Sequence, residues 1–70
     1  MNASKLRGKI TEAGMTVGEF CEKAVFNRST FDRKIHGKSQ FTLVELRKII
    51  TILNLSDDDA RNIFFTEEVT

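Results

Sequence analysis

Two short segments between residues 15 and 38 repeat apolar residues with the period of a helix, and only a few residues separate them. In the first segment, four apolar residues fall at i, i+3, i+4 and i+7, which is one face of a helix: Val17, Phe20, Cys21 and Ala24. In the second segment, Phe31 and Ile35 share one side. The sequence therefore predicts two helices hinged at residues 24–27, with the rest of the short chain organised around them.

The ends of both predicted helices carry residues that commonly cap helices. Thr16 precedes the first helix and Glu19 follows three residues later, which is the spacing of a capping box. The second begins at Asn27, whose side chain can accept a hydrogen bond from a free amide of the first turn. It ends at Gly37, which tolerates the left-handed backbone that often follows a helix. These signals place the two helices at residues 16–24 and 28–36.

The outer side of the second predicted helix is polar and carries a guanidinium. At about 100° per residue, Arg33 falls nearly opposite Phe31 and Ile35. The other polar residues of this helix are Arg28, Ser29, Thr30, Asp32, Lys34 and His36. Hydroxyl and guanidinium groups on the exposed side of a helix suit the edges of bases in a major groove. A plainer interpretation, that any surface helix is polar on its outer side, stays open.

Taken together, these residues resemble the Cro and C-repressor (XRE) type of helix-turn-helix. The segments that carry the resemblance are Thr16, Glu19–Ala24, Asn27–Phe31 and Gly37–Lys38. They look most like small phage Cro-like and repressor-like proteins, and the similarity covers roughly residues 5 to 65. It implies an all-α, compact five-helix, lambda-repressor-like DNA-binding domain whose helix-turn-helix is formed by the second and third helices.

The resemblance also implies roles for individual residues. The positions that read bases in such proteins correspond to Arg28, Ser29, Asp32 and Arg33. The positions that touch phosphate correspond to Thr16, Val17, Lys38, Ser39 and Gln40. We also expect phosphate contacts from Asn27, Thr30 and Lys34. A loop of lysine, hydroxyl and amide at residues 38–40 suits phosphate independently of the family, although it is equally an ordinary connector.

Asp32 has two possible roles. It can accept a hydrogen bond from a cytosine amino group. Alternatively, it can belong to a ladder with Arg28 and His36 at i, i+4 and i+8, which orients the arginine and stabilises the helix by a few tenths of a kcal/mol per pair. We favour the ladder.

One position departs from the family pattern. Val25 occupies the hinge position that is usually glycine, and a β-branched residue at positive φ is an outlier. Gly18, inside the first of the two helices, costs about 1 kcal/mol relative to alanine. Either the turn therefore differs from that of the family, or the alignment with the family is shifted at this position.

The overall charge of +1 hides a division along the chain. Up to Lys48, ten lysines and arginines face five acids, a local charge of +5. From Ile49 onward, the chain contains one basic residue, Arg61, and five acids, which gives a local charge of −4. The basic part contains the predicted helix pair and offers a place for phosphate. The acidic part can equally serve solubility.

Three further helices complete the predicted fold. The first spans residues 2–13, with Asn2 or Ser4 as its cap and with Leu6, Ile10 and Ala13 facing inward. Another spans 42–54, with a Thr42–Glu45 capping box and an inward stripe of Leu43, Leu46, Ile49, Ile50 and Leu53. Val44 and Ile52 add apolar surface beyond that stripe, which serves either core packing or a contact with another subunit. The last helix spans 56–65 and is capped by Ser56. Six phenylalanines and the absence of Tyr, Trp and proline favour an all-helical domain.

The C-terminal helix raises questions of metal binding and dimerisation. Three adjacent acids, residues 57–59, suit the positive end of a helix dipole, and we do not expect a metal because the spacing of a calcium loop is absent. Three large apolar residues follow, and one face cannot bury all of them: Ile63, Phe64 and Phe65. At least one is therefore a candidate dimer contact. Residues 66–70 are expected to be loose or to form an arm.

Length and composition set outer limits. Seventy residues make one domain, spanning 1–70, near the smallest size at which a single core folds unaided, so dimerisation would help. The single cysteine, Cys21, fits a reducing compartment and is expected to be a small buried hydrophobe. With no apolar run of about 18 residues and no leader pattern, we expect a cytoplasmic chain.

These patterns lead to one favoured function and one alternative. The favoured function is a sequence-specific regulator that binds a double-stranded DNA operator as a homodimer and represses a promoter, as a phage Cro-like repressor does. The alternative is a helical protein-protein interaction module, of antirepressor or antitoxin type, that keeps the fold. We expect no enzyme, cofactor, metal, membrane partner or small-molecule substrate, because no catalytic constellation is present in the sequence.

Overall fold

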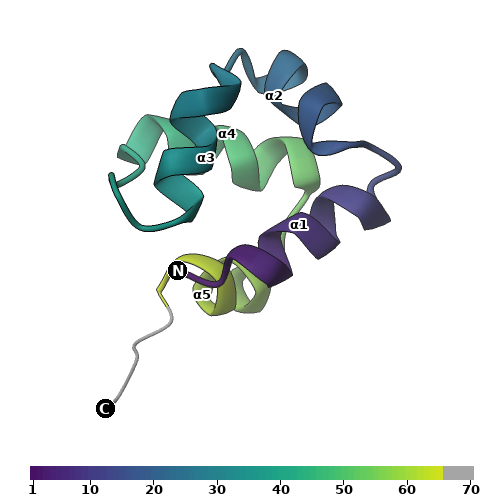
Figure 1. The fold of residues 1–70 in the computed structure, drawn as a ribbon. Helices are drawn as coiled ribbons and strands as arrows, with labels where there is room; N and C mark the ends of the chain where they lie inside the picture. The colour runs from purple at the N-terminus through teal and green to yellow at the C-terminus, as the bar shows by residue number, and fades with distance from the viewer. Residues whose placement is uncertain (66–70) are drawn as a thin grey trace.

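The computed structural model describes residues 1–65, and within them the chain forms five α-helices and no strand (Figure 1). The helices are α1 (Ala3–Glu12), α2 (Val17–Ala24), α3 (Arg28–Ile35), α4 (Leu43–Leu53) and α5 (Asp57–Phe64). Each begins and ends within one residue of its predicted range, because most predicted ranges included the capping residues. The expected all-α class is confirmed.

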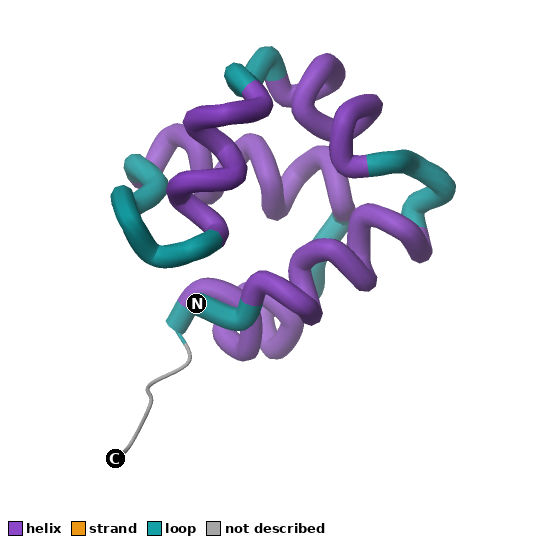
Figure 2. Tube along the Cα trace, in the orientation of Figure 1, coloured by secondary structure: helices purple, strands orange, loops and turns teal. Residues whose placement is uncertain are grey.

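Helix α2 lies at the centre of the packing, in contact with α1, α3 and α4, while α5 packs against α1. In Figure 1, α1 and α5 form one side of the molecule, and α2, α3 and α4 form the other. The tube view shows that the connections are short turns, apart from a longer loop between α3 and α4 (Figure 2). Residues far apart in the sequence therefore meet in one core.

A side chain caps the start of each of these five helices. The capping residues are Asn2, Thr16, Asn27, Thr42 and Ser56, each accepting a hydrogen bond from an amide three residues later. Both predicted capping boxes are present, at Thr16 with Glu19 and at Thr42 with Glu45. Because the first amides of a helix have no partner within it, these caps fix the helix starts locally.

Four helices end on a residue with left-handed backbone: Gly14, Val25, Gly37 and Asn54. At the end of α2, the amide of Phe26 donates to the carbonyl of Cys21 at 2.8 Å, and the amide of Val25 donates to that of Glu22 at 3.2 Å. This is the Schellman pattern, which glycine or asparagine normally completes. Val25 adopts φ 59° and ψ 45°, so a β-branched residue occupies the left-handed conformation at this turn, which is strained.

The core is built largely from phenylalanine. Phe31 of α3 has its ring centroid 5.7 Å from that of Phe20 and 5.9 Å from those of Phe26 and Phe41. Phe41 continues the contact to Phe64 of α5 at 6.4 Å. One aromatic cluster thus joins α2, the turn after it, α3, the α3–α4 loop and α5. Ring pairs at these distances add about 0.5–1.5 kcal/mol each beyond the area they bury.

Two of the predicted inward residues face solvent instead. Ala13 is exposed beyond the last turn of α1, and Leu43 is 65% exposed at the start of α4. Both lie at a helix end, where the small core no longer extends far enough to cover the side chain. Leu55, which follows α4 and had no predicted role, is buried instead.

The first and last helices are tied together by charge and by backbone. The Lys9 ammonium lies 3.1 Å from the Asp59 carboxylate, with Lys5 at 3.9 Å from the same group. The hydrogen bond from Lys9 lowers the pKa of Asp59, and the same bond raises the pKa of Lys9. The amide of Asn2 also donates to the carbonyl of Ile63 at 2.8 Å. Lys5 and Lys9 therefore serve the contact between α1 and α5.

Replacing Val25 with glycine is expected to stabilise the protein. Relief of the left-handed strain is worth about 1–2 kcal/mol, and the added flexibility of glycine in the unfolded chain offsets about 0.5–1 kcal/mol. Because the Val25 side chain is 82% exposed, little burial is lost. Chemical denaturation should show the free energy of unfolding of Val25→Gly to be higher by about 0.5–1 kcal/mol. Val25→Ala, which keeps a Cβ atom, should stay close to the original protein. A less stable glycine variant would contradict the assignment of strain.

Candidate functional site

Helix α3 presents a polar side to solvent and an apolar side to the core. Phe31 and Ile35 are 1% and 5% exposed, as predicted. In Figure 1, α3 lies toward the viewer with α4 behind it, and no other helix crosses its outer side. The exposed residues of this helix and its C-cap are Arg28, Ser29, Arg33 and His36. The core contact therefore decides which side chains a partner can reach.

The side chain of Arg28, the first residue of α3, extends toward the first turn of α2. Its Nε atom is 3.4 Å from a carboxylate oxygen of Asp32, one turn further along the helix. A Cβ atom placed on Gly18 would lie 3.7 Å from Nη1 of Arg28, so the guanidinium reaches back to the start of α2. At that distance the added Cβ would make ordinary van der Waals contact with the guanidinium, so the approach does not require glycine at this position. Arg28 thus lies beside Thr16 and Val17 of the predicted phosphate set.

The predicted ladder on α3 is present in only one of its two steps. Arg28 pairs with the Asp32 carboxylate, but Nδ1 of His36 lies 2.7 Å from the main-chain carbonyl of Asp32 and not from its side chain. Because a carbonyl oxygen only accepts, Nδ1 carries the hydrogen in this contact. His36 therefore closes the end of α3, and the Asp32 carboxylate is left to Arg28.

The loop after α3 keeps its polar groups exposed. Lys38, Ser39 and Gln40 are all exposed, next to the end of the helix. Within residues 1–65, neither Lys38 nor Arg33 forms an ion pair, so both positive charges face solvent. Both cations lie at the C-terminal end of α3, where the amide of Lys38 donates to the carbonyl of Arg33 at 3.0 Å, so together they offer positive charge to an anion at that end.

The remaining predicted contacts are partly engaged by the fold. Thr16 and Asn27 use a side-chain oxygen to accept from the amides of Glu19 and Thr30, at 3.1 Å each. The hydroxyl hydrogen of Thr16 and the amide group of Asn27 are still able to donate. Val17 and Thr30 are half-buried. At Val17, the main-chain amide lies in the first turn of α2, where amides lack helical partners.

Lys34 does not belong with the predicted phosphate contacts. Its ammonium lies 2.6 and 2.8 Å from the two carboxylate oxygens of Glu45 in α4, and its side chain is 13% exposed. The same ammonium is 5.6 Å from the centre of the Phe41 ring. The charge is therefore neutralised inside the molecule, where it joins α3 to α4. Sequence reasoning missed this because α3 and α4 are brought together by the fold.

Glu45 carries two tasks at once. It accepts hydrogen bonds from Lys34 and, at 2.8 Å, from the amide of Thr42 in the capping box. The hydrogen bond from Lys34, followed by that from Thr42, holds the pKa of Glu45 below its ordinary value. A lowered carboxylate pKa means that the ionised form stabilises the folded state. This contribution is complete above the ordinary pKa and is lost as the pH falls through the lowered one.

Cys21 is a core residue. It is 3% exposed, and burial raises the pKa of its thiol, with Arg28 opposing and Asp32 assisting the shift. A thiol that resists ionisation is a weak nucleophile. This agrees with the small buried hydrophobe expected from the sequence.

Of the three candidate dimer contacts, the structure removes one. Ile63 is 0% exposed and belongs to the core, so it cannot contact a partner while the fold is intact. The hydrophobic face of α5 required one large residue at this position. Phe64 is half-buried against Phe41, and Phe65 is 63% exposed. The expected arm at residues 66–70 lies outside the described residues.

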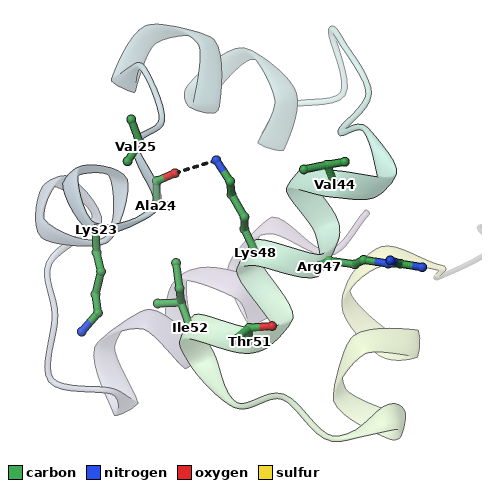
Figure 3. A pocket seen from close by; sticks show the side chains of 8 residues that line it. All are labelled: Lys23, Ala24, Val25, Val44, Arg47, Lys48, Thr51 and Ile52. Carbon is green, nitrogen blue, oxygen red and sulfur yellow. Dashed lines mark hydrogen bonds between the residues drawn. The ribbon is translucent and has the colours of Figure 1, made fainter.

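A second surface feature was not predicted, a hollow of about 510 Å³ between the end of α2 and α4 (Figure 3). We name it the α2–α4 groove and define it by Lys23, Val25, Val44, Arg47, Lys48 and Ile52. Figure 3 shows Lys48 crossing from α4 to α2, where its ammonium donates to the carbonyl of Ala24 at 3.3 Å. The surplus apolar residues Val44 and Ile52 were the only sequence signal for this surface.

The described chain is thus an all-α bundle of five short helices. It matches no protein-family model, no curated protein and no solved structure. Among residues 1–65, no helix has both the length and the apolar character to cross a membrane. In that same region, His, Cys, Asp and Glu side chains form no group of three or more that could hold a metal ion. The carboxylate of Asp59 instead faces α1, and Asp58 lies 3.7 Å from Arg61.

Glu45→Gln should lower stability in a pH-dependent way. At neutral pH, the variant leaves the largely buried Lys34 without its counter-charge, and we expect a loss of about 1–2 kcal/mol in the free energy of unfolding. As the pH falls below the ordinary pKa of glutamate, the original protein loses the same contribution, so the difference between the two should shrink. Urea denaturation at a series of pH values measures it. A difference that stays constant into acid would show that the ion pair contributes nothing.

Proposed function

We propose that this protein is a sequence-specific regulator that binds double-stranded DNA through a lambda-repressor-like helix-turn-helix formed by α2 and α3. The observation that carries the proposal is the outer side of α3. Arg33 projects from it unpaired within residues 1–65, while Phe31 and Ile35 hold the opposite side in the core. A rigid helix with an exposed guanidinium is suited to reading a major groove.

In this proposal, Arg28 and Arg33 supply the base contacts with the help of Ser29. A guanidinium can donate two parallel hydrogen bonds to O6 and N7 of guanine, worth about 1–3 kcal/mol of discrimination. Arg33 has all its donors free of ion pairs among the described residues. Arg28 uses Nε toward Asp32 at 3.4 Å, which leaves its terminal nitrogens to face a base. Asp32 then acts by orienting Arg28.

Phosphate contacts flank α3 on two sides. On one side lie Thr16 and the free amides of the first turn of α2, beside the guanidinium of Arg28. On the other lie the exposed side chains of residues 38–40. Contacts of this kind set the register of a protein on the duplex without reading its sequence. The two sets of phosphate contacts are separated by the length of α3. This separation suits the two phosphate backbones that border a major groove.

In the proposed function, the protein acts as a homodimer. One recognition helix touches too few base pairs for useful specificity, and two copies related by a two-fold axis read half-sites about 34 Å apart. Bound across a promoter, the dimer represses by excluding polymerase. This requires no chemistry, only occupancy.

Selection of bound sequences from a random DNA pool, combined with gel shift at several salt concentrations, tests the proposal. We expect a two-fold symmetric site and an affinity that falls steeply with salt, because each neutralised phosphate releases counterions. Binding that is absent, or that does not respond to salt, would overturn the DNA-binding function. It would favour the alternative, a helical protein-interaction module, which is supported by the apolar α2–α4 groove.

Three variants separate base contacts, phosphate contacts and structural charges. Arg33→Ala should cost about 1–3 kcal/mol at the preferred site and relax specificity at one base position. Lys38→Met should weaken binding to all sequences equally and reduce the salt slope by about one. Lys34→Met is the matched control. It removes the same charge from a residue that pairs with Glu45, so it should lower folding stability and leave the salt slope unchanged.

Asp32→Asn distinguishes the two roles of this carboxylate. Because the structure pairs Asp32 with Arg28, we expect the variant to relax specificity at the base that Arg28 reads and to have no further effect once Arg28 is replaced by alanine. The measurement is the affinity of Asp32→Asn, Arg28→Ala and the double variant for a panel of operators with single base changes. If Asp32→Asn relaxed specificity at a position that Arg28→Ala leaves unchanged, Asp32 would itself be reading a base.

A further inference from the structure

The α2–α4 groove combines an apolar lining with positive charge. Val25 and Val44 are 82% and 66% exposed, and Ile52, which also lines the groove, is half-buried. Lys23, Arg47 and Lys48 also line the groove, and no acid does. In Figure 3, Lys48 crosses the groove toward Ala24, and the Arg47 side chain extends away from Val25 and Ile52. Its volume of about 510 Å³ lies in the range of sites that bury a ligand. A partner for this surface must be both apolar and acidic.

Val25 gives a second reason to expect an occupant. Its left-handed backbone is unfavourable for a β-branched residue, and its exposed side chain gains almost no burial within the monomer. A strained residue with a protruding apolar side chain is the kind of feature that contributes by touching another molecule. Glycine at this position would complete the turn with less strain but would remove that contact.

The same surface on a second copy is not a suitable occupant. A two-fold contact of groove against groove would bring Arg47 and Lys48 close to their own counterparts, and the like charges would repel. The chain does carry a complementary segment. Phe65 is 63% exposed at the end of α5, and the sequence after it contains Glu67, Glu68 and Val69.

Phe65 does not reach the groove of its own chain. It lines a separate hollow with Met1, Gln40 and Phe64, and that hollow shares no residue with the α2–α4 groove. In a two-fold dimer, however, an element of each copy can be exchanged with the other. The acidic and apolar segment of one copy then meets the basic and apolar groove of its partner, twice per dimer.

We infer that the homodimer forms by reciprocal exchange, with the segment that begins at Phe65 seated in the α2–α4 groove of the other copy. The exposed Phe65 supplies apolar contact for Val25, Val44 and Ile52, and the negative charge of the sequence after it complements the positive charge of the groove. The inference rests on the homodimer of the proposed function. Its tests use no DNA, so its failure is distinguishable from failure of DNA binding.

Sedimentation equilibrium of the full chain over a range of concentrations tests the groove. Val44→Asp should weaken the dimer roughly tenfold or more, about 1.4 kcal/mol or more. Leu43→Asp is the matched control, since Leu43 is 65% exposed but does not line the groove, and both variants place a carboxylate in the first turn of α4. It should leave the dimer unchanged. Val25→Gly should weaken the dimer while making the monomer fold more stable, which a loss of folding cannot mimic.

The segment is tested by Phe65→Ala and by the double variant Glu67→Gln with Glu68→Gln. Each should weaken the dimer, and added salt should weaken the original dimer but affect the double variant less. Asp57→Asn with Asp58→Asn removes the same charge from the start of α5 and should have no effect on association. Circular dichroism melting confirms that each variant is folded.

A mixture of two defective variants gives the decisive result. Val44→Asp keeps its segment, and Phe65→Ala keeps its groove, so a mixed dimer recovers one complete contact. The mixture should therefore associate more tightly than either variant alone. A monomeric original protein, equal effects of Val44→Asp and Leu43→Asp, or a mixture no tighter than its parts would each overturn the inference. The first of these results would point to an acidic partner of another kind.

Discussion

The burial of Phe31 against three other phenylalanine rings is the interaction on which the remaining structure depends. It fixes the rotation of α3, and the rotation of a helix decides which of its polar residues face solvent. With centroid distances of 5.7 to 5.9 Å to Phe20, Phe26 and Phe41, the ring joins α2, the turn, α3 and the following loop. Arg33 faces outward because Phe31 faces inward. The proposed DNA-reading surface is therefore a consequence of the aromatic core.

Internal ion pairs then determine which of the many cations are free. Lys34 is neutralised by Glu45 and Lys9 by Asp59, at 2.6 and 3.1 Å, so neither adds to the surface available to phosphate. Arg28 is oriented by Asp32 and stays partly available, while Lys38 and Arg33 are unpaired within residues 1–65. The charge of +5 counted along the first 48 residues already includes Glu45, but the contact of Lys9 with Asp59 lowers the charge that an external anion meets, because Asp59 belongs to the acidic part.

Val25, at the end of α2, is both strained in its backbone and exposed in its side chain. Val25 closes a turn that normally requires glycine, and its side chain joins Val44 and Ile52 on a surface rimmed by Lys23, Arg47 and Lys48. This surface lies apart from the outer side of α3. The molecule thus offers two partner-facing surfaces of different chemistry: one with hydroxyls and guanidinium groups, the other apolar with positive charge.

Sequence by itself determined the five helices, their caps and the inward residues of α2 and α3, because capping and 3.6-residue periodicity are local properties that a few neighbouring residues specify. It also identified Val25 as an unusual residue at a position that is usually glycine, and the structure showed that its backbone is left-handed. Only the tertiary structure decided that Leu43 is exposed, that Ile63 is buried and that Lys34 belongs to Glu45, since these depend on which helices come together and how far the small core extends. The α2–α4 groove has the same origin: residues 23–25 and 44–52 meet because α2 packs on α4, and no local pattern encodes the distance between them.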